Sequence, residues 1–244
     1  MPLSRVRKDL FDVAALPLPQ RIGRVVWATP MSRFIILLGG SLVRTPRLDA
    51  QMDGARVIAA DTGMSHATML DVVPELWIGD FDSAPADLPS ELAAVPQIRF
   101  EPDKDKTDGE LAVAEAISRG ATSLVLAGAF GGPRADHAFL HAALAIRRAK
   151  EGLAVLLTSG AQEGSPLLPG SRTFDFEDGT LFSILGFSHL SGLTVIGAKW
   201  PLDSVEVPFG SSLTISNEVR GDLCISLAVG RAMLLAHPFP GEEF

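Results

Sequence analysis

The chain has 244 residues, of which 47% are hydrophobic and 20% charged, a balance that permits a folded core and argues against a disordered protein. A formal charge of -8 argues against binding to nucleic acid, because affinity for a phosphate backbone depends on clustered Lys and Arg. The single cysteine, Cys224, excludes an internal disulfide framework and a cysteine-based zinc cluster, and it fits a reducing, cytoplasmic location.

Residues 1–30 differ in composition from the rest of the chain. They hold Arg5, Arg7 and Lys8 but no continuous apolar stretch followed by a small-residue cleavage site, so we predict no signal peptide. No segment reaches about 18 consecutive apolar residues, so we expect no membrane-spanning helix and no membrane partner. We treat residues 1–30 as an N-terminal extension and assign it no function.

Residues 31–163 alternate short apolar runs with helical segments, which is typical of a parallel sheet covered on both faces. The clearest helix starts at Thr107, a suitable N-cap with Glu110 three residues later, and ends at Gly120. We therefore predict an α/β parallel-sheet, Rossmann-like, catalytic domain. Its predicted strands are 34–38, 56–60, 76–78, 98–100, 123–127 and 154–158, and its predicted helices are 63–71, 107–119 and 135–151.

Beyond about residue 165, Gly and Pro separate short runs with alternating polarity. Such runs occur at 180–185, 192–196 and 223–227, and turn-forming residues lie between them. This pattern predicts an all-β sandwich domain over residues 170–244, with a domain boundary in the Gly- and Pro-rich stretch at 160–170.

Polar clusters follow four of the predicted parallel strands. Because ligands bind at the carboxyl ends of such strands, the four clusters together predict one site, although each alone would be a turn with solvated acids. The clusters are Asp61-Thr62-Gly63, Gly79-Asp80-Phe81-Asp82-Ser83, residues 103–108 and residues 131–137.

The pair Asp80 and Asp82 calls for a cation or a shared proton. Two carboxylates about 4 Å apart oppose each other by roughly 4 kcal/mol at an effective dielectric near 20. Mg²⁺ fits best, since it takes oxygen ligands and needs only one or two protein carboxylates plus phosphates. Asp108 is the third candidate ligand; its alternative role is that of a first-turn acid favoured by the helix dipole.

Basic and other acidic residues complete the predicted site. Arg134 is the natural phosphate clamp, since a guanidinium binds two phosphate oxygens at once; the alternative is a surface ion pair with Asp136. Asp136 either orients Arg134 or accepts a proton from an attacking hydroxyl. Asp61 holds a metal-bound water or a substrate, or else forms a strand-end turn. Lys104 and Lys106 either reach phosphate or remain solvated. His137 and His141, which lack the Glu of an HExxH zinc site, are expected to be structural or to support residues that contact the ligand.

In their order along the chain, these motifs resemble the thiamine pyrophosphokinase family over residues 34–239. Three departures are the threonine at position 62, where the family has a glycine, a shorter glycine-to-arginine spacing in the loop before Asp136, and the extension at residues 1–30, which has no counterpart in the family. The motifs are Ala60-Asp61-Thr62-Gly63, the GDFDS sequence at 79–83, the PDKDKTD sequence at 102–108, the GGPRADH sequence at 131–137, the GAKWPL sequence at 197–202, the FGSS sequence at 209–212, and Ser216-Asn217.

The resemblance implies Mg²⁺-dependent transfer of pyrophosphate from ATP to the hydroxyl of thiamine, giving AMP and thiamine diphosphate. It further implies a homodimer with its site at the interface. The implied ATP-binding residues are Asp61, Lys104, Thr107 and Arg134. The cationic thiazolium favours the aromatic face of Trp200, whose alternative role is sandwich core. The implied thiamine residues are Trp200, Ser211, Ser212, Ser216 and Asn217, with turn chemistry as the alternative for the serines.

Three other functions remain open at this point. The nearest is the same reaction on another hydroxymethyl acceptor, such as a pterin. The second is a metal-dependent phosphohydrolase, suggested by the Asp80-Phe81-Asp82 pattern, although Ala84 stands where aspartate-nucleophile phosphatases have Thr or Val. The third is a non-catalytic nucleotide-binding module.

Overall fold

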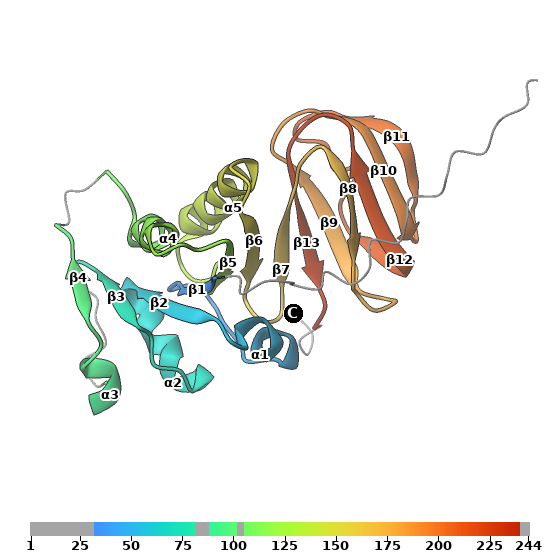
Figure 1. Cartoon of the computed structure of the whole chain (residues 1–244). Helices are drawn as coiled ribbons and strands as arrows, with labels where there is room; N and C mark the ends of the chain where they lie inside the picture. The colour runs from blue at the N-terminus through green and yellow to red at the C-terminus, as the bar shows by residue number, and fades with distance from the viewer. Residues whose placement is uncertain (1–31, 82–87, 102–104, 240–244) are drawn as a thin grey trace, which may run out of the picture. The chain divides into compact units, whose positions relative to one another are not determined.

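The computed structural model describes residues 32–81, 88–101 and 105–239, and the predicted N-terminal extension lies outside these ranges (Figure 1). None of the helices in the described ranges is long and apolar enough to cross a membrane.

A parallel sheet of six strands forms the first part of the described chain. Strand β1 (Arg33–Leu37) lies between β2 (Arg56–Ala60) and β5 (Ser123–Ala127) and is parallel to both. Beyond β2 follow β3 (Leu76–Gly79) and β4 (Gln97–Arg99), and beyond β5 follows β6 (Ala154–Thr158). The order is therefore β6-β5-β1-β2-β3-β4, and the direction in which the chain adds strands reverses between β1 and β5.

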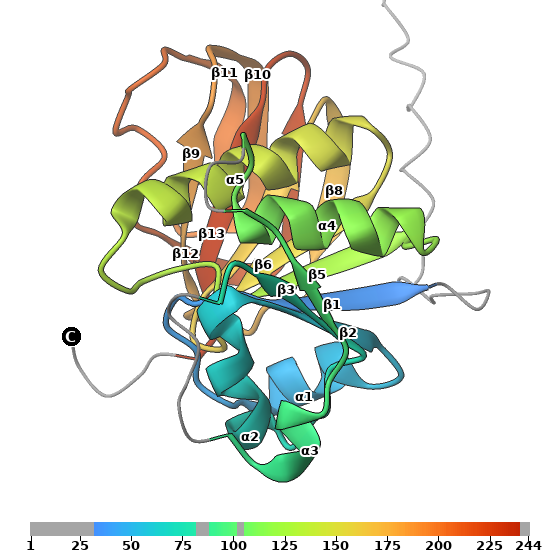
Figure 2. The same cartoon turned by 90° about the vertical axis from the view of Figure 1, so that its left-hand side faces the viewer.

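Helices cover both faces of this sheet because side chains alternate along the buried strands. Phe34 and Ile36 of β1 belong to one core cluster, which includes residues of α4 (Asp108–Ser118) and α5 (Ala135–Lys150). Ile35 of the same strand belongs to the opposite cluster. That cluster includes residues of α1 (Pro46–Met52), the short 3₁₀ helix η1 (Asp61–Ser65), α2 (His66–Leu70) and α3 (Ser90–Ala93), and Figure 2 shows the two layers. The predicted parallel sheet covered on both faces is confirmed.

The sheet continues without interruption into antiparallel strands. Strand β7 (Glu163–Leu167) pairs with β6 on one side and with β13 (Ala232–His237) on the other, and β13 pairs with β9 (Leu181–Gly186). These strands and their neighbours enclose a third core that includes Phe182 and Leu193. The arrangement is compatible with the predicted sandwich. The remaining strands are β8 (Gly170–Phe174), β10 (Leu190–Ala198), β11 (Leu202–Val207) and β12 (Asn217–Leu227).

The structure differs from the sequence prediction mainly in short or polar elements. The helix predicted at 63–71 is a 3₁₀ turn followed by the five-residue α2. The predicted boundary stretch at 160–170 contains β7, whose residues are all buried. Thr107 caps α4 as predicted, its Oγ1 accepting a hydrogen bond from Glu110 N at 3.3 Å, but the Glu110 carboxylate accepts a hydrogen bond from Arg147. The division into domains stays a prediction.

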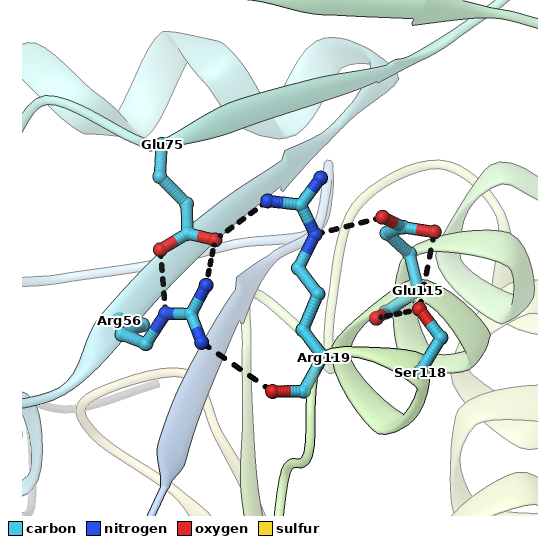
Figure 3. Close-up of polar contacts among 5 residues, drawn as sticks. All are labelled: Arg56, Glu75, Glu115, Ser118 and Arg119. Atoms are coloured by element: carbon cyan, nitrogen blue, oxygen red, sulfur yellow. Dashed lines mark hydrogen bonds and ion pairs between the residues drawn. The ribbon is translucent and has the colours of Figure 1, made fainter.

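At the amino-terminal ends of the parallel strands, charged side chains pair with one another (Figure 3). Glu75 accepts hydrogen bonds from both guanidinium groups beside it, with 2.6 Å between its Oε1 and an Nη of Arg56 and 3.0 Å to an Nη of Arg119. Arg119 also donates from Nε to Glu115 Oε1 at 2.7 Å. The network joins β2, the segment before β3, and the carboxyl end of α4. We name these four residues the amino-end network.

Candidate functional site

One cavity of about 650 Å³ lies at the carboxyl ends of the parallel strands. Its lining comes from each of the four loops in which the sequence predicts polar clusters. Such an edge favours ligand binding, above all where the strand order reverses. The predicted site residues that line the cavity are Asp61, Asp80, Thr107, Asp108 and Arg134.

Three lining glycines that sequence reasoning missed come from two neighbouring loops, and we name them together the glycine turn. Gly39 and Gly40 follow β1, and Gly128 follows β5, so all three lie where the strand order reverses. A side chain at Gly40 would place its Cβ 2.4 Å from the carbonyl oxygen of Gly128, which is too close for any residue but glycine. The available signal was the glycine pair directly after the first strand, which becomes meaningful only when β5 is known to be its neighbour.

Side chains of neighbouring residues hold the backbone of two cavity acids, Asp61 and Asp80, through hydrogen bonds. Asp61 has a φ of +44°, uncommon for a residue with a Cβ, and its carbonyl oxygen accepts a hydrogen bond from Trp77 Nε1 at 2.9 Å. The carbonyl oxygen of Asp80 accepts one from an Nη of Arg99 at 2.7 Å. Among the described residues with a positive φ, the unusual conformation falls on Asp61 and not on the neighbouring Thr62. Thr62 therefore does not adopt the positive φ that favours glycine, and its Cβ causes no backbone strain of that kind.

The donor set suits a hard cation, although the described residues alone do not enclose one. Asp61, Asp80 and Asp108 line a single cavity, and Mg²⁺ takes one or two carboxylate ligands together with phosphates and water. Within the described ranges, no group of three or more His, Cys, Asp or Glu side chains is arranged to hold a metal. Asp82 and Lys104 lie outside the described residues.

Arg134 lines the cavity and forms with Asp136, which is not among the lining residues, the surface ion pair that is its predicted alternative role. The Arg134 Nε lies 2.9 Å from Asp136 Oδ1 and an Nη lies 2.6 Å from Oδ2, with both side chains 63% exposed. The hydrogen bonds from Arg134 lower the pKa of Asp136 from 3.8 to about 2. A carboxylate with such a pKa is a weak proton acceptor, so the geometry favours the orienting role for Asp136 over the basic one.

Two histidines support the glycine turn and the loop after β5. His66, the first residue of α2, lies with its Nε2 2.9 Å from the carbonyl oxygen of Gly40. His141, on α5, is buried with its Nδ1 3.1 Å from the carbonyl oxygen of Ala129. His137 and Lys106 also line the cavity. The sequence predicts a structural role for His141, and its bond to Ala129 agrees with that role.

The residues predicted to bind thiamine lie on the antiparallel part and do not line this cavity. Trp200 is 54% exposed, which contradicts its alternative role as sandwich core. Lys199 Nζ lies 4.7 Å from the centroid of the Trp200 ring, so that ring already faces one cation. A second cavity, of about 460 Å³, is lined in part by Ala198, Pro201 and Leu202, on either side of Trp200 in the chain.

Asn217 and Ser211 bond through their side chains to the protein backbone, whereas Ser212 and Ser216 take part through their own backbone atoms. Asn217 is buried, and its side-chain amide accepts from Trp200 N at 3.1 Å and donates to Trp200 O at 2.8 Å. Ser211 Oγ accepts from Leu213 N, and Ser216 N donates to the hydroxyl of Ser183. The carbonyl oxygen of Ser212 accepts from Ile215 N. Asn217 thus fixes the backbone that carries Trp200.

Two family models match the chain in succession. Residues 51–157 match the thiamin pyrophosphokinase catalytic domain, and residues 173–233 match the thiamin pyrophosphokinase vitamin B1 binding domain. Together the two matches cover most of the chain.

Individual relatives agree with these models. Thiamine pyrophosphokinase of Bacillus subtilis (strain 168) is 29% identical over 196 residues, which cover 78% of this chain and 90% of that protein. The crystal structure of thiamine pyrophosphokinase from Bacillus subtilis superimposes with a TM-score of 0.73 at 25% identity, covering 84% of this chain and 99% of that one. Thiamin pyrophosphokinase from Candida albicans, at 11% identity, shares the fold with a TM-score of 0.70 over 86% of this chain and 94% of that one. The chain belongs to the thiamin pyrophosphokinase family.

Proposed function

We propose that the chain transfers a diphosphoryl group from ATP to the hydroxyl of thiamine. The observation that carries the proposal beyond family membership is the gathering of Asp61, Asp80, Asp108 and Arg134 around one cavity where the strand order reverses. In the reaction the hydroxyl oxygen of thiamine bonds to the β-phosphorus of ATP. The bond from that phosphorus to the oxygen bridging to the α-phosphate breaks, AMP leaves with that oxygen, and the hydroxyl proton is released to water.

Each group has a part that follows from its chemistry. Phosphoryl-type transfer depends mainly on positioning and on stabilisation of charge. Asp80 and Asp108, together with Asp82, would hold Mg²⁺, which when bound neutralises charge on the phosphate oxygens. Arg134, oriented by Asp136, would bind phosphate oxygens at two points. The glycine turn lets the loops after β1 and β5 pack closely on each other at the edge of the sheet where the strand order favours ligand binding.

The acceptor side supports a shared site. Trp200 is exposed and none of the five predicted thiamine residues lines the nucleotide cavity of its own chain. We propose that two copies form a homodimer in which the antiparallel part of one supplies thiamine to the cavity of the other. A cytoplasmic location remains part of this proposal.

A single assay separates the proposed reaction from its rivals. The protein is incubated with ATP, Mg²⁺ and thiamine, and nucleotides and thiamine esters are quantified together. We expect one AMP for each thiamine diphosphate, with no AMP when either Mg²⁺ or thiamine is omitted. Release of ADP or free phosphate would favour a phosphohydrolase. AMP formed with a hydroxymethyl pterin but not with thiamine would point to another acceptor, and nucleotide binding without any product would indicate a non-catalytic module.

A further inference from the structure

His141 carries a hydrogen-bond acceptor at the cavity that none of the roles above uses. The residue is only 7% exposed and lines the cavity from α5. Its Nδ1 lies 3.1 Å from the carbonyl oxygen of Ala129, and a carbonyl oxygen can only accept. Nδ1 therefore holds the proton, and Nε2 of the neutral ring is left with a lone pair.

The surroundings of Nε2 keep that lone pair available. Among the described residues, Nε2 of His141 has no hydrogen-bond partner. This edge of the ring faces the start of α4, where a methyl group added at Gly109 would lie 3.5 Å from Nε2. Burial and the ring of His137, whose centroid is 6.3 Å away, lower the pKa of His141. The imidazole consequently stays neutral near pH 7 and acts as an acceptor there.

The chemistry of an acceptor limits what it can bind. Ionised phosphate oxygens are acceptors themselves, so a neutral Nε2 does not attract them, whereas a hydroxyl group, like an amino group, donates to it. Both substrates of the proposed reaction bring hydroxyls, in the ribose of ATP and in the alcohol of thiamine. We propose that Nε2 of His141 accepts a hydrogen bond from a substrate hydroxyl and so positions that substrate in the cavity. The inference rests on the proposed function, because that function supplies the two hydroxyls.

Two substitutions separate this role from the structural one. The amide nitrogen of His141→Asn falls where Nδ1 lies and can keep the bond to Ala129, but the variant lacks the distal acceptor. The amide of His141→Gln reaches the position of Nε2 and restores an acceptor there. We expect kcat/KM to fall roughly three- to tenfold in His141→Asn, the range of one neutral hydrogen bond, and to recover in His141→Gln. The matched control is His189→Asn, whose side chain is 57% exposed on the antiparallel part and whose kinetics should not change.

Kinetics with altered nucleotides show which substrate supplies the hydroxyl. If the ribose donates, wild-type protein prefers ATP over 2′-deoxy-ATP or 3′-deoxy-ATP, and His141→Asn loses that preference. If the alcohol of thiamine donates, the loss in His141→Asn is the same with all three nucleotides and appears with thiamine as the varied substrate. Either result supports the proposal.

A measurement on the unaltered protein keeps the test independent of how well the variants fold. With ¹⁵N-labelled histidine, the Nε2 resonance of His141 should move when either thiamine or Mg²⁺ with α,β-methylene-ATP is added. An Nε2 resonance unaffected by both, or wild-type kinetics in His141→Asn, would overturn the proposal. Absence of AMP formation by the wild-type protein would instead contradict the proposed reaction. The resonance measurement detects binding and not turnover, so it distinguishes the two failures.

Discussion

The two ends of the parallel sheet differ in how their charged side chains are arranged. At the amino ends, the amino-end network sets each carboxylate against a guanidinium, so the charges neutralise one another. At the carboxyl ends, Asp61, Asp80 and Asp108 line one cavity, and Arg134, which also lines it, is paired with Asp136. The difference teaches that self-neutralising charges fasten elements together, whereas acids gathered around a cavity are suited to an external cation.

Substitution of the cavity acids should have the largest effect. Asp108→Asn keeps the size of the side chain and removes the charge offered to Mg²⁺, so kcat/KM should fall by about 10²- to 10³-fold, as when a group that stabilises the transition state is lost. Asp82→Asn should behave in the same way. Steady-state AMP formation measures the loss, and the thermal midpoint shows whether the fold is intact.

The alternative role of Asp108 gives a different result. A first-turn acid that acts only through the helix dipole contributes about 0.3 to 1 kcal/mol to stability, so its loss would lower the midpoint and leave turnover unchanged. Asp71→Asn is the control, since Asp71 is exposed at the end of α2 and outside the cavity lining.

An intermediate effect is expected at Arg134. Arg134→Lys keeps the charge but loses the two-point geometry, and Arg134→Ala loses both. We expect the KM for ATP to rise about 10-fold with Lys and up to about 100-fold with Ala, the range of charged hydrogen bonds. Arg44→Lys, at an exposed ion pair with Asp49, is the control. A KM for ATP that is unchanged in Arg134→Ala would leave Arg134 with only its surface ion pair.

The smallest effect is expected at the opposite end of the sheet. Glu75→Gln should lower the free energy of unfolding by about 1 kcal/mol or less at pH 7, because its ion pairs are partly exposed, and should leave turnover unchanged. Hydrogen bonds from Arg56 lower the pKa of Glu75 from 4.5, so the stabilisation is present above pH 4.5 and is lost as pH falls through the folded-state pKa. Denaturant titrations of the wild-type and Glu75→Gln proteins should therefore give different free energies of unfolding at pH 7 and similar values in acid. A Glu75→Gln protein that is stable but inactive would contradict the contrast between the two ends.

Strongly apolar strands and long helices could be predicted from the sequence. The bounds predicted at 56–60, 123–127 and 154–158 coincide with β2, β5 and β6, because continuous apolar runs mark strands covered on both faces. Strand β7 carries no such signal: it reads Glu-Gly-Ser-Pro-Leu. Its Glu163 is buried because Arg47 and Gln51, more than a hundred positions earlier, bond to its carboxylate. Partners so distant in sequence leave no local pattern.

Some residues of the candidate site could likewise be predicted from the sequence, and others could not. Its acids and Arg134 lie in short motifs directly after predicted strands, so the sequence could assign them to one edge. The glycine turn, His66 and the free edge of His141 depend on which strand lies beside β1 and how α5 packs. Those are tertiary facts, and a single residue type at one position does not encode them.

The position of β7 also has a consequence for how the chain is made. It pairs with β13, which is synthesised only after all the other strands of the antiparallel part. Until residues 232–237 leave the ribosome, β7 presents an open strand edge, and such edges pair readily with other chains. Chains that stop before β13 are therefore expected to aggregate rather than to accumulate as a separate nucleotide-binding fragment.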